Sequence, residues 1–291
     1  MIPAQGTVRE TSGPGALQAS RETRQRFQDQ VAAKRDHWIW ANQYYYNRLT
    51  RLLRFVVEPG KRVLEVRCQT GHLLAAVEPA YGVGVEISEK LITVARSNFP
   101  HLEFVQAQPE DLDLGETFDY VIFSHVFDTV DILSAFGRVR NHCTGRTRLV
   151  VVNYNQLWQP IVGTASKLGL RSRFIEPNWV DEDDLHGFLA LAGFKPLRTH
   201  RIMLFPKYIP VVSWVLNDVL AYLPGVRRLC MMQALVARPV PEPLREKDVS
   251  VSVIVPCRNE SGNIRAAVAH RRHTRLLERD FDRDGVLEGV G

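Results

Sequence analysis

The sequence has few cysteines, and their spacing excludes two kinds of protein. Cys68, Cys143, Cys230 and Cys257 are the only four in 291 residues, and no two of them form a Cys-x-x-Cys pair. Disulfide scaffolds and cysteine-based zinc sites need closer spacing, so neither is expected, and this usage fits a reducing cytosol. The N-terminus also lacks the apolar core of a signal peptide. We therefore expect a cytoplasmic protein.

Long apolar runs are missing as well. The most apolar stretch, Ile202 to Leu223, is interrupted by prolines and by Lys207 and Asp218, whereas a membrane span needs about 20 predominantly apolar residues. We expect residues 203–229 to form an amphipathic insert that makes peripheral contact with the inner face of a membrane.

The charge pattern does not point to nucleic acid. The net charge of +5 is mild and is concentrated between Arg21 and Arg54. We interpret these basic residues as a solvated helical face, with attraction to an anionic membrane surface as the alternative. No basic motif has the interleaved aromatics typical of nucleic-acid binding.

Composition divides the chain into four segments. Residues 1–20 are rich in Gly, Pro, Ser, Thr and Gln and are expected to be disordered. Residues 21–239 begin with helical patterns and continue with alternating strand and helix patterns, which predicts one α/β domain. The proline-rich residues 240–248 form a linker, and residues 249–291 open as a second strand-to-helix unit.

The α/β domain is organised around the stretch from Arg62 to Val77. A β-rich apolar run ends at a short polar segment and resumes as an Ala- and Leu-rich stretch, which predicts strand, tight loop and helix. In nucleotide-binding α/β units this loop lies at the carboxyl end of the first strand, where backbone N–H groups and the helix N-terminus face a ligand.

Residues 65–71, Glu-Val-Arg-Cys-Gln-Thr-Gly, resemble motif I of class I S-adenosylmethionine (SAM) dependent methyltransferases of the ubiquinone and menaquinone type. The family pattern is an acidic residue followed by three alternating glycines. Only Gly71 is present, and Arg67 and Gln69 stand at the first two glycine positions. Side chains there would enter the space of the ligand's amino acid part unless both turn outward. The alternative is a turn that binds nothing.

Two further segments extend the resemblance. Tyr81 to Ser88 is predicted as a second strand ending in Glu86, a carboxylate placed to accept from ribose hydroxyls. After a third strand, Gln108 stands where the family usually has an Asp that accepts from the adenine amino group. The resemblance implies SAM as the cofactor, bound by Glu65, Arg67, Cys68, Gln69, Thr70, Gly71, Glu86, Ile87, Gln108, Pro109 and Ser124.

Four residues are candidates for contact with an acceptor. His125, in the loop after the fourth strand, is the candidate base if a proton must leave the acceptor, with structural hydrogen bonding as the alternative. Tyr45, in a helix ahead of the first strand, is a candidate lid residue. Tyr154 and Asn155, after the fifth strand, are candidates for stacking and amide hydrogen bonds. Core packing and loop anchoring are the alternatives.

The predicted fold is α/β, a Rossmann-like seven-stranded class I methyltransferase sheet with helices on both faces. It has an N-terminal helical extension and an incomplete C-terminal α/β fragment. Phe194–Met203 and Met231–Ala237 supply the last two strands. The acids from Asp181 to Asp184 are interpreted as helix caps, and no metal site is expected.

The second unit carries a different resemblance. The valine-rich residues 249–255 run into Pro-Cys-Arg-Asn-Glu at residues 256–260, which resembles the truncated start of an inverting family 2 glycosyltransferase. That resemblance ends near Ala267, before any metal-binding Asp-x-Asp of that family.

Two functions follow from these resemblances. One is SAM-dependent methyl transfer to a small-molecule or lipid-linked acceptor in polysaccharide or envelope biosynthesis. The other is a degenerate methyltransferase fold that no longer binds SAM and serves a docking or regulatory role for a glycosyltransferase.

Overall fold

The computed structural model describes residues 14–168 and 179–240. The chain divides into two units, Met1–Glu242 and Pro243–Gly291, and every described residue belongs to the first. The glycosyltransferase-like residues 249–291 therefore lie outside the described residues. The strands are β1 (Arg62–Val66), β2 (Tyr81–Glu86), β3 (Glu103–Gln106), β4 (Phe118–Phe123), β5 (Cys143–Tyr154), β6 (Phe194–Ile202) and β7 (Met232–Pro239).

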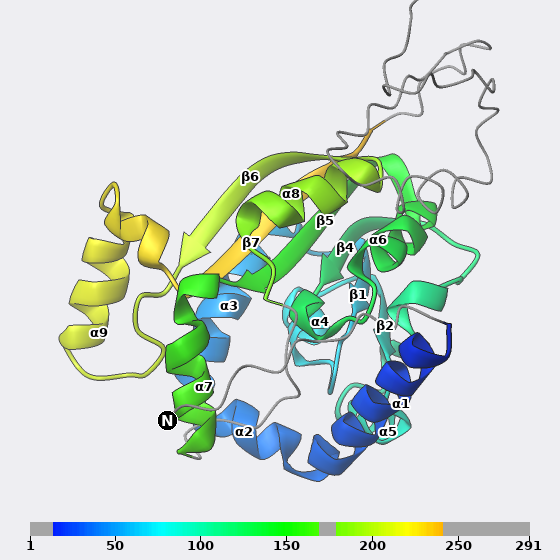
Figure 1. Ribbon diagram of the computed structural model, residues 1–291, viewed down its shortest axis with the longest axis horizontal. Coiled ribbons are helices and arrows are strands. Elements are labelled where there is room, and N and C mark those ends of the chain that lie inside the picture. The colour runs from blue at the N-terminus through cyan, green and yellow to red at the C-terminus, as the bar shows by residue number, and fades with distance from the viewer. Residues whose placement is uncertain (1–13, 169–178, 241–291) are drawn as a thin grey trace, which may run out of the picture. The chain divides into compact units, whose positions relative to one another are not determined.

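These strands form one sheet in the order β3-β2-β1-β4-β5-β7-β6, which confirms the predicted seven-stranded methyltransferase fold (Figure 1). The five strands from β1 to β5 pair in parallel, and β7 runs antiparallel between β5 and β6. Helices cover both faces of the parallel part, so β1 is buried at four of its five positions. The carboxyl ends of the parallel strands meet at one edge, where ligands bind in such sheets.

Helices and short 3-10 turns surround the sheet. The longer ones are α1 (Pro14–Val31), α2 (Arg35–Ala41), α3 (Gln43–Val56), α4 (His72–Ala76), α5 (Glu89–Asn98), α6 (Ile132–Asn141), α7 (Gln159–Lys167) and α8 (Glu182–Leu191). The short turns are η1 (Ala32–Lys34), η2 (Pro109–Asp111), η3 (Val126–Asp128) and η4 (Gln156–Trp158). Between β6 and β7 lie α9 (Val212–Trp214), the π-helical turn η5 (Val215–Val219) and the 3-10 turns η6 (Leu220–Tyr222) and η7 (Val226–Leu229).

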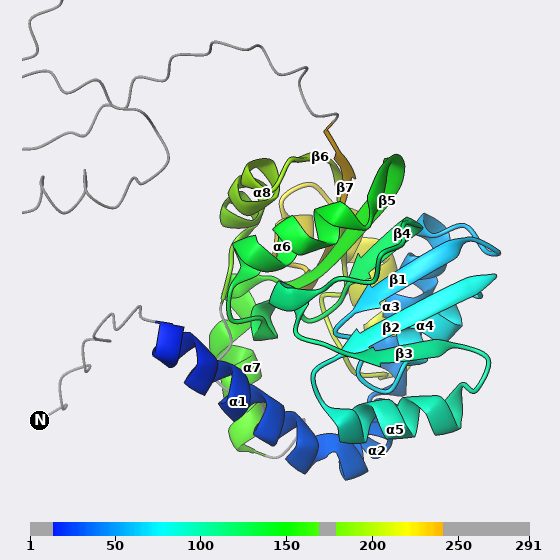
Figure 2. The ribbon, with the colours of Figure 1, turned by 90° about the vertical axis from the view of Figure 1, so that its right-hand side faces the viewer.

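Each face of the sheet has its own hydrophobic core, because successive strand residues point to opposite sides. Phe136 of α6 and Leu185 of α8 pack on the face that includes Leu64. Leu53 of α3 and Leu74 of α4 pack on the opposite face. Figure 2 shows these two helix layers with the sheet between them.

Helix α8 starts as its sequence predicts. The Asp181 carboxylate accepts a hydrogen bond from the Asp184 backbone N–H at 2.7 Å, which is an N-cap. Glu182, Asp183 and Asp184 all lie in the first turn, where negative charge complements the helix dipole.

Two predictions about the N-terminal region are wrong. Helix α1 begins at Pro14, so the predicted disorder of residues 1–20 does not hold for residues 14–20. Arg24 was expected on a solvated face but is only 7% exposed. Its buried ion pair with Asp128 explains the difference, since a buried arginine needs a carboxylate partner.

No helix among the described residues has the length and hydrophobicity needed to cross a bilayer.

Close packing of β2 against β3 and the loop after β1 gives a test of the fold. A Cβ added at Gly84 would lie 2.7 Å from both Cys68 Sγ and Phe104 Cδ1. We expect Gly84→Ala to lower the free energy of unfolding by about 1–3 kcal/mol through overpacking, measured by urea denaturation. Gly137→Ala in α6 is the control, because nothing lies within 4 Å of its Cβ. It should gain roughly 0.5–1 kcal/mol of helix propensity. Equal losses in both variants would contradict this packing.

Candidate active site

The loop between β1 and α4 keeps the backbone of a three-glycine loop with only one glycine. Arg67, Gln69 and Gly71 have φ values of 66°, 53° and 79°, all in the left-handed region. Only glycine adopts this conformation without cost, and other residues lose about 1–2 kcal/mol each. Two hydrogen bonds hold the loop: Cys68 N–H donates to Val85 O at 3.0 Å, and Gly71 N–H donates to Cys68 O at 2.9 Å. The loop therefore takes a backbone conformation that favours glycine at three positions, with strain at Arg67 and Gln69.

The Arg67 side chain turns into the site and is 2% exposed. Its Nη1 donates to Glu86 Oε1 at 2.8 Å, and its Nη2 donates to Asp128 Oδ2. Glu86 also accepts from two backbone N–H groups, Ile87 on Oε1 at 2.8 Å and Gln69 on Oε2 at 3.1 Å. The Glu86 carboxylate at the end of β2 is therefore already hydrogen-bonded to groups of the protein itself.

Helix α1 completes this cluster from outside. Arg24 donates to Asp128 Oδ1 at 2.8 Å, and Gln28 donates to Asp128 Oδ2 at 2.7 Å. The next residue of α1, Asp29, accepts from Ser88, the residue that caps α5 after β2. Figure 2 shows α1 alongside α5 at this edge of the sheet. Helix α1 therefore covers the carboxyl ends of β2 and β4, where the adenosine end of a SAM site would lie.

The charges of this cluster compensate one another, since two arginines pair with the carboxylates of Glu86 and Asp128. Burial disfavours the charged form of Arg67, but Glu86 and Asp128 outweigh that effect and raise the pKa of the guanidinium above its ordinary value. Breaking a buried pair by removing one partner typically costs about 3–5 kcal/mol, because the other charge is left unpaired. Asp128 would still keep Arg24 and Gln28, so Glu86 depends most on Arg67.

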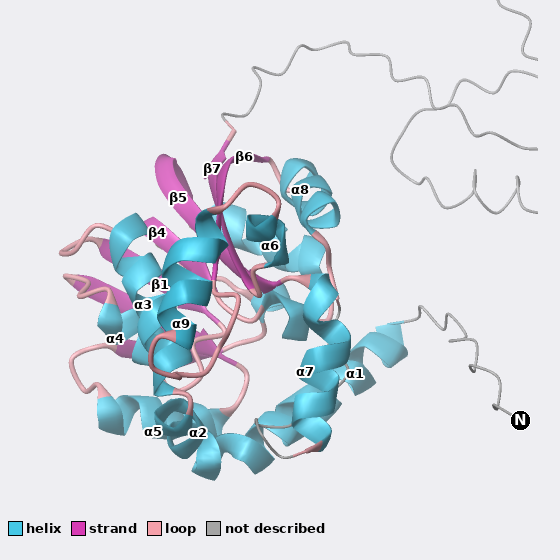
Figure 3. Ribbon diagram, turned by 90° about the vertical axis from the view of Figure 1, so that its left-hand side faces the viewer, coloured by secondary structure: helices cyan, strands magenta, loops and turns pink. Residues whose placement is uncertain are grey.

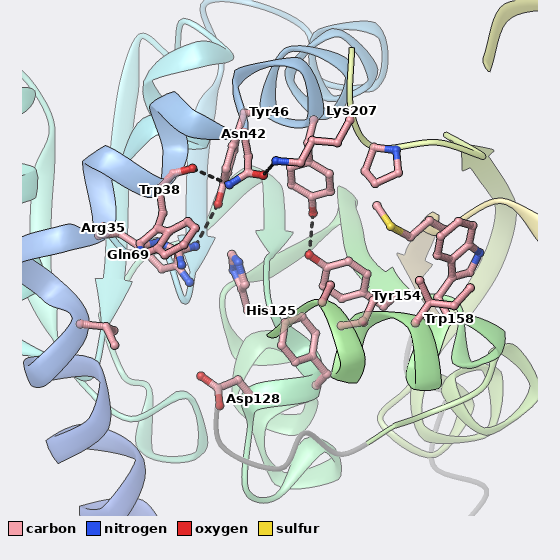
Figure 4. Close-up of a pocket in the computed structure, with 18 of the residues that line it drawn as sticks. Arg35, Trp38, Asn42, Tyr46, Gln69, His125, Asp128, Tyr154, Trp158 and Lys207 are labelled. Atoms are coloured by element: carbon pink, nitrogen blue, oxygen red, sulfur yellow. Dashed lines mark hydrogen bonds between the residues drawn. The ribbon is translucent and has the colours of Figure 1, made fainter. Parts of the chain in front are cut away.

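A cavity of about 300 Å³ lies beside this cluster (Figure 4). Its walls come from α1, α2, α3, the loop after β4, the segment from Tyr154 to α7, and the insert after β6. Most of its lining is apolar or aromatic: Phe27, Val31, Trp38, Tyr45, Tyr46, Phe127, Tyr154, Trp158, Ile161, Val162, Ala165, Phe205, Pro206 and Met231. The polar lining residues are Gln28, Arg35, Asn42, Gln69, His125, Asp128 and Lys207.

Hydrogen bonds hold several of the polar side chains in place. Arg35 donates to the Tyr46 hydroxyl at 3.0 Å, and Lys207 donates to Asn42 Oδ1 at 2.9 Å (Figure 4). The Tyr45 and Tyr154 hydroxyls lie 3.1 Å apart. The cavity therefore combines apolar walls with two cations, Arg35 and Lys207, and a pair of phenols, a lining suited to an amphiphilic ligand.

The structure brings four predicted site residues together at the cavity: Tyr45, Gln69, His125 and Tyr154. The other predicted cofactor residues lie outside its lining: Glu65, Arg67, Cys68, Thr70, Gly71, Glu86, Ile87, Gln108, Pro109 and Ser124. A Cβ at Gly71 would lie 2.8 Å from Phe104 Cζ, so this glycine serves packing between α4 and β3.

Asn155 is held by backbone groups. Its Nδ2 donates to Arg228 O at 2.7 Å and to Cys230 O at 2.9 Å, while its Oδ1 accepts from Leu157 N–H. These bonds tie the end of β5 to the insert.

Glu65 is buried beneath the loop, 0% exposed, and accepts from Ser124 Oγ at 2.6 Å. Burial raises the pKa of Glu65 to about 8, although the Ser124 hydrogen bond works in the opposite direction. Among the described residues, its Oε2 has no hydrogen-bond partner. Glu65 is therefore mostly protonated near pH 7.

Several residues of the site were not predicted from the sequence. Asp128 joins the cluster from η3, and Arg35 and Lys207 supply the cavity's cations. The i, i+4 spacing of Arg24 and Gln28 was the one available signal, because it places both side chains on one helix face. Lys207 carried no local signal, since the insert that holds it is distant in sequence from α2.

Residues 38–199 match the methyltransferase domain family, more than half of the chain. The chain belongs to this family. No curated protein sequence matches it. A Thermotoga maritima structure described as a SAM-dependent methyltransferase, possible histamine N-methyltransferase, has a TM-score of 0.60 at 14% identity, covering 74% of this chain and 98% of that one. A Haloferax volcanii complex of the Trm112 methyltransferase activator with a putative methyltransferase has a TM-score of 0.57 at 17% identity, with the same coverage.

The methyltransferase family and the neighbour described as SAM-dependent imply S-adenosylmethionine as the cofactor. The ribose of this cofactor would bind at the carboxyl end of β2, called here the ribose end of the site. The residues present there do not fit a ribose. The Arg67 guanidinium occupies the position beside Glu86 from which ribose hydroxyls would donate. Neither Glu86 nor Gln108 borders the cavity. A nucleoside would have to displace a buried ion pair to reach this carboxylate.

Strain at Gln69 gives a second prediction. Because φ is 53° at this residue, Gln69→Gly should raise the free energy of unfolding by about 0.5–1 kcal/mol. Gln108→Gly is the matched control, since φ is −76° there and glycine should cost roughly 0.5–1 kcal/mol. Urea denaturation of both variants measures the difference, and a loss of stability in Gln69→Gly would contradict the loop conformation.

Glu65 gives a prediction about pH. Its folded pKa of about 8 lies above the ordinary 4.5, so the folded state holds a proton that the unfolded state releases between these values. The stability from this group is complete below pH 4.5 and declines by up to about 1.4 kcal/mol per pH unit as the pH rises toward 8. Glu65→Gln keeps an acceptor for Ser124 and removes the titration.

Urea denaturation from pH 5 to pH 8.5 checks this prediction. The variant should match the natural chain near pH 5 and exceed its stability at pH 8.5. Glu89→Gln, at an exposed position in the first turn of α5, should show no such divergence. Parallel curves for the natural chain and Glu65→Gln would show that Glu65 is ionised in the folded state.

Proposed function

We propose that this methyltransferase-family domain binds an amphiphilic small or lipid-linked molecule in its cavity and works without SAM, as a binding or docking module. The observation that carries the proposal is the buried pair between Arg67 and Glu86. It places a permanent cation where the cofactor's ribose would bind, and α1 holds the neighbouring carboxylate of Asp128 from outside.

The chemistry of the cavity supports this ligand class. Trp38, Tyr154 and Trp158 offer ring faces for an apolar body. Arg35 and Lys207 offer donors for an acidic or phosphate-bearing head group. The cavity's volume of about 300 Å³ falls at the lower end of the range for small-molecule pockets.

The second candidate function is SAM-dependent methyl transfer to the same ligand. The family match over residues 38–199 favours it. It also has support from Glu65, whose buried Oε2 has no partner within the described part of the chain. His125, which lines the cavity, is the candidate base in this case.

The biological setting is part of the proposal. The resemblance of residues 249–264 to a glycosyltransferase suggests a role beside glycosyl transfer in polysaccharide or envelope biosynthesis, at the inner face of the membrane. A module that holds a lipid-linked acceptor would serve such a reaction by docking its substrate.

Calorimetric titration with S-adenosylhomocysteine separates the two functions. The natural chain should show no binding, because Arg67 occupies the ribose end of the site. Arg67→Gly combined with Gln69→Gly should bind at micromolar concentration, because it frees Glu86 and restores both glycines. Micromolar binding by the natural chain would overturn the proposal in favour of methyl transfer.

Two further measurements keep this experiment interpretable. Gln69→Gly alone is the matched control and should not bind, since it leaves Arg67 in place. A thermal unfolding curve of the double variant shows whether it folds, and bound ligand should raise its melting temperature. A folded double variant that fails to bind would show that the ribose end is closed by something other than Arg67.

A further inference from the structure

The insert between β6 and β7 exposes an unusual amount of apolar surface. Its side chains with large exposed fractions are Tyr208 (68%), Ile209 (45%), Val211 (72%), Val212 (44%), Trp214 (61%), Val219 (42%), Tyr222 (72%), Leu223 (45%) and Leu229 (51%). Single exposed apolar residues are ordinary, but nine within residues 208–229 form a concentration that marks an interaction surface. Figure 3 shows α9 on the outside of the domain, over α3.

The insert is partly inverted, because two of its polar side chains, Ser213 and Asn217, are buried while its large apolar side chains listed above are exposed. Asn217 is 1% exposed; its Oδ1 accepts from Leu204 and Phe205 N–H groups at 2.7 and 2.9 Å. Its Nδ2 donates to the Tyr44 hydroxyl at 3.0 Å. Ser213, also 1% exposed, accepts from Ile209 N–H. These bonds hold the apolar side chains outward, so their exposure belongs to the folded state.

The charge of the insert is complementary to an anionic surface. Residues 204–229 contain Lys207, Arg227 and Arg228 and a single acid, Asp218. Arg48 of α3 neutralises that acid through an ion pair at 2.8 Å. Basic residues near an anionic membrane surface are attracted to it. The exposed rings of Tyr208, Trp214 and Tyr222 are the side-chain types enriched at membrane interfaces.

The same insert forms one wall of the cavity. Phe205, Pro206 and Lys207 line it, and Lys207 donates to Asn42 at the end of α2 at 2.9 Å. Trp158 Nε1 donates to Leu229 O at 2.7 Å, which joins this wall to the far end of the insert. A molecule leaving a bilayer at the insert would therefore meet the cavity directly.

We propose that residues 204–229 are a docking surface for an anionic lipid bilayer, and that the amphiphile bound in the cavity is taken from that bilayer. The docking surface goes beyond the proposed function. The origin of the amphiphile in that bilayer rests on the proposed function. Trp214, Tyr222 and the neighbouring apolar side chains enter the interface between head groups and acyl chains, while Arg228 and Lys207 face the head groups.

Vesicle sedimentation with the full-length chain tests the docking surface. The probes are vesicles of phosphatidylcholine alone and of phosphatidylcholine mixed equally with phosphatidylglycerol. The chain should bind the mixed vesicles and should be released by high salt. Trp214→Ser combined with Tyr222→Ser should weaken this binding by at least about tenfold, because two interfacial rings are lost.

Two other variants complete the test. Arg228→Glu should weaken binding to mixed vesicles several-fold and leave binding to neutral vesicles unchanged. Trp40→Ser is the matched control, because Trp40 is 72% exposed but lies in α2, outside the cavity lining. It should bind like the natural chain. Circular dichroism of each variant confirms folding.

The outcomes separate this inference from the proposed function, because vesicle binding needs neither SAM nor a ligand in the cavity. Absence of vesicle binding by the natural chain would overturn the docking surface. Equal weakening by Trp40→Ser would also overturn it. Self-association that the Trp214→Ser and Tyr222→Ser changes abolish, without vesicle binding, would assign the surface to a second copy of the chain instead.

Discussion

The ion pair between Arg67 and Glu86 is the contact on which the rest of the site depends. It places a buried cation at the carboxyl edge of the sheet, and this cation needs further negative charge. Asp128 supplies that charge and in turn binds Arg24 and Gln28. Arg67 therefore closes the ribose end and separates the cavity from Glu86, while Asp128 and Ser88 hold α1 over this edge.

The fold was predictable from the sequence because its signals are local. Alternation of strands and helices, the acid that ends β2 and the cap at Asp181 each depend on a few neighbouring residues. The site was predictable only in part. The sequence shows that Arg67 and Gln69 replace glycines, but not where their side chains point. That direction depends on Asp128, 61 residues away, and such pairs leave no periodic pattern.

The cavity and the insert also show which features the sequence could predict and which it could not. Tyr45 and Tyr154 were candidates from their positions beside predicted elements, and both line the cavity. Lys207 was noted only as a charge interrupting an apolar stretch. The amphipathic character of residues 203–229 was visible in the sequence, but its inversion was not, because burial of Ser213 and Asn217 depends on helix α3 and on the turns of the insert itself.

The large sequence separation between helix α1 and its partner Asp128 has a consequence for synthesis of the chain. Arg24 pairs with a residue 104 positions later in the chain. At roughly 5–20 residues per second, a ribosome adds that length in about 5 to 20 seconds. Throughout that interval the nascent α1 carries its arginine and glutamine without their carboxylate. Helix α1 is therefore made first and docks late, so the edge of the sheet closes only after the strands beneath it have assembled.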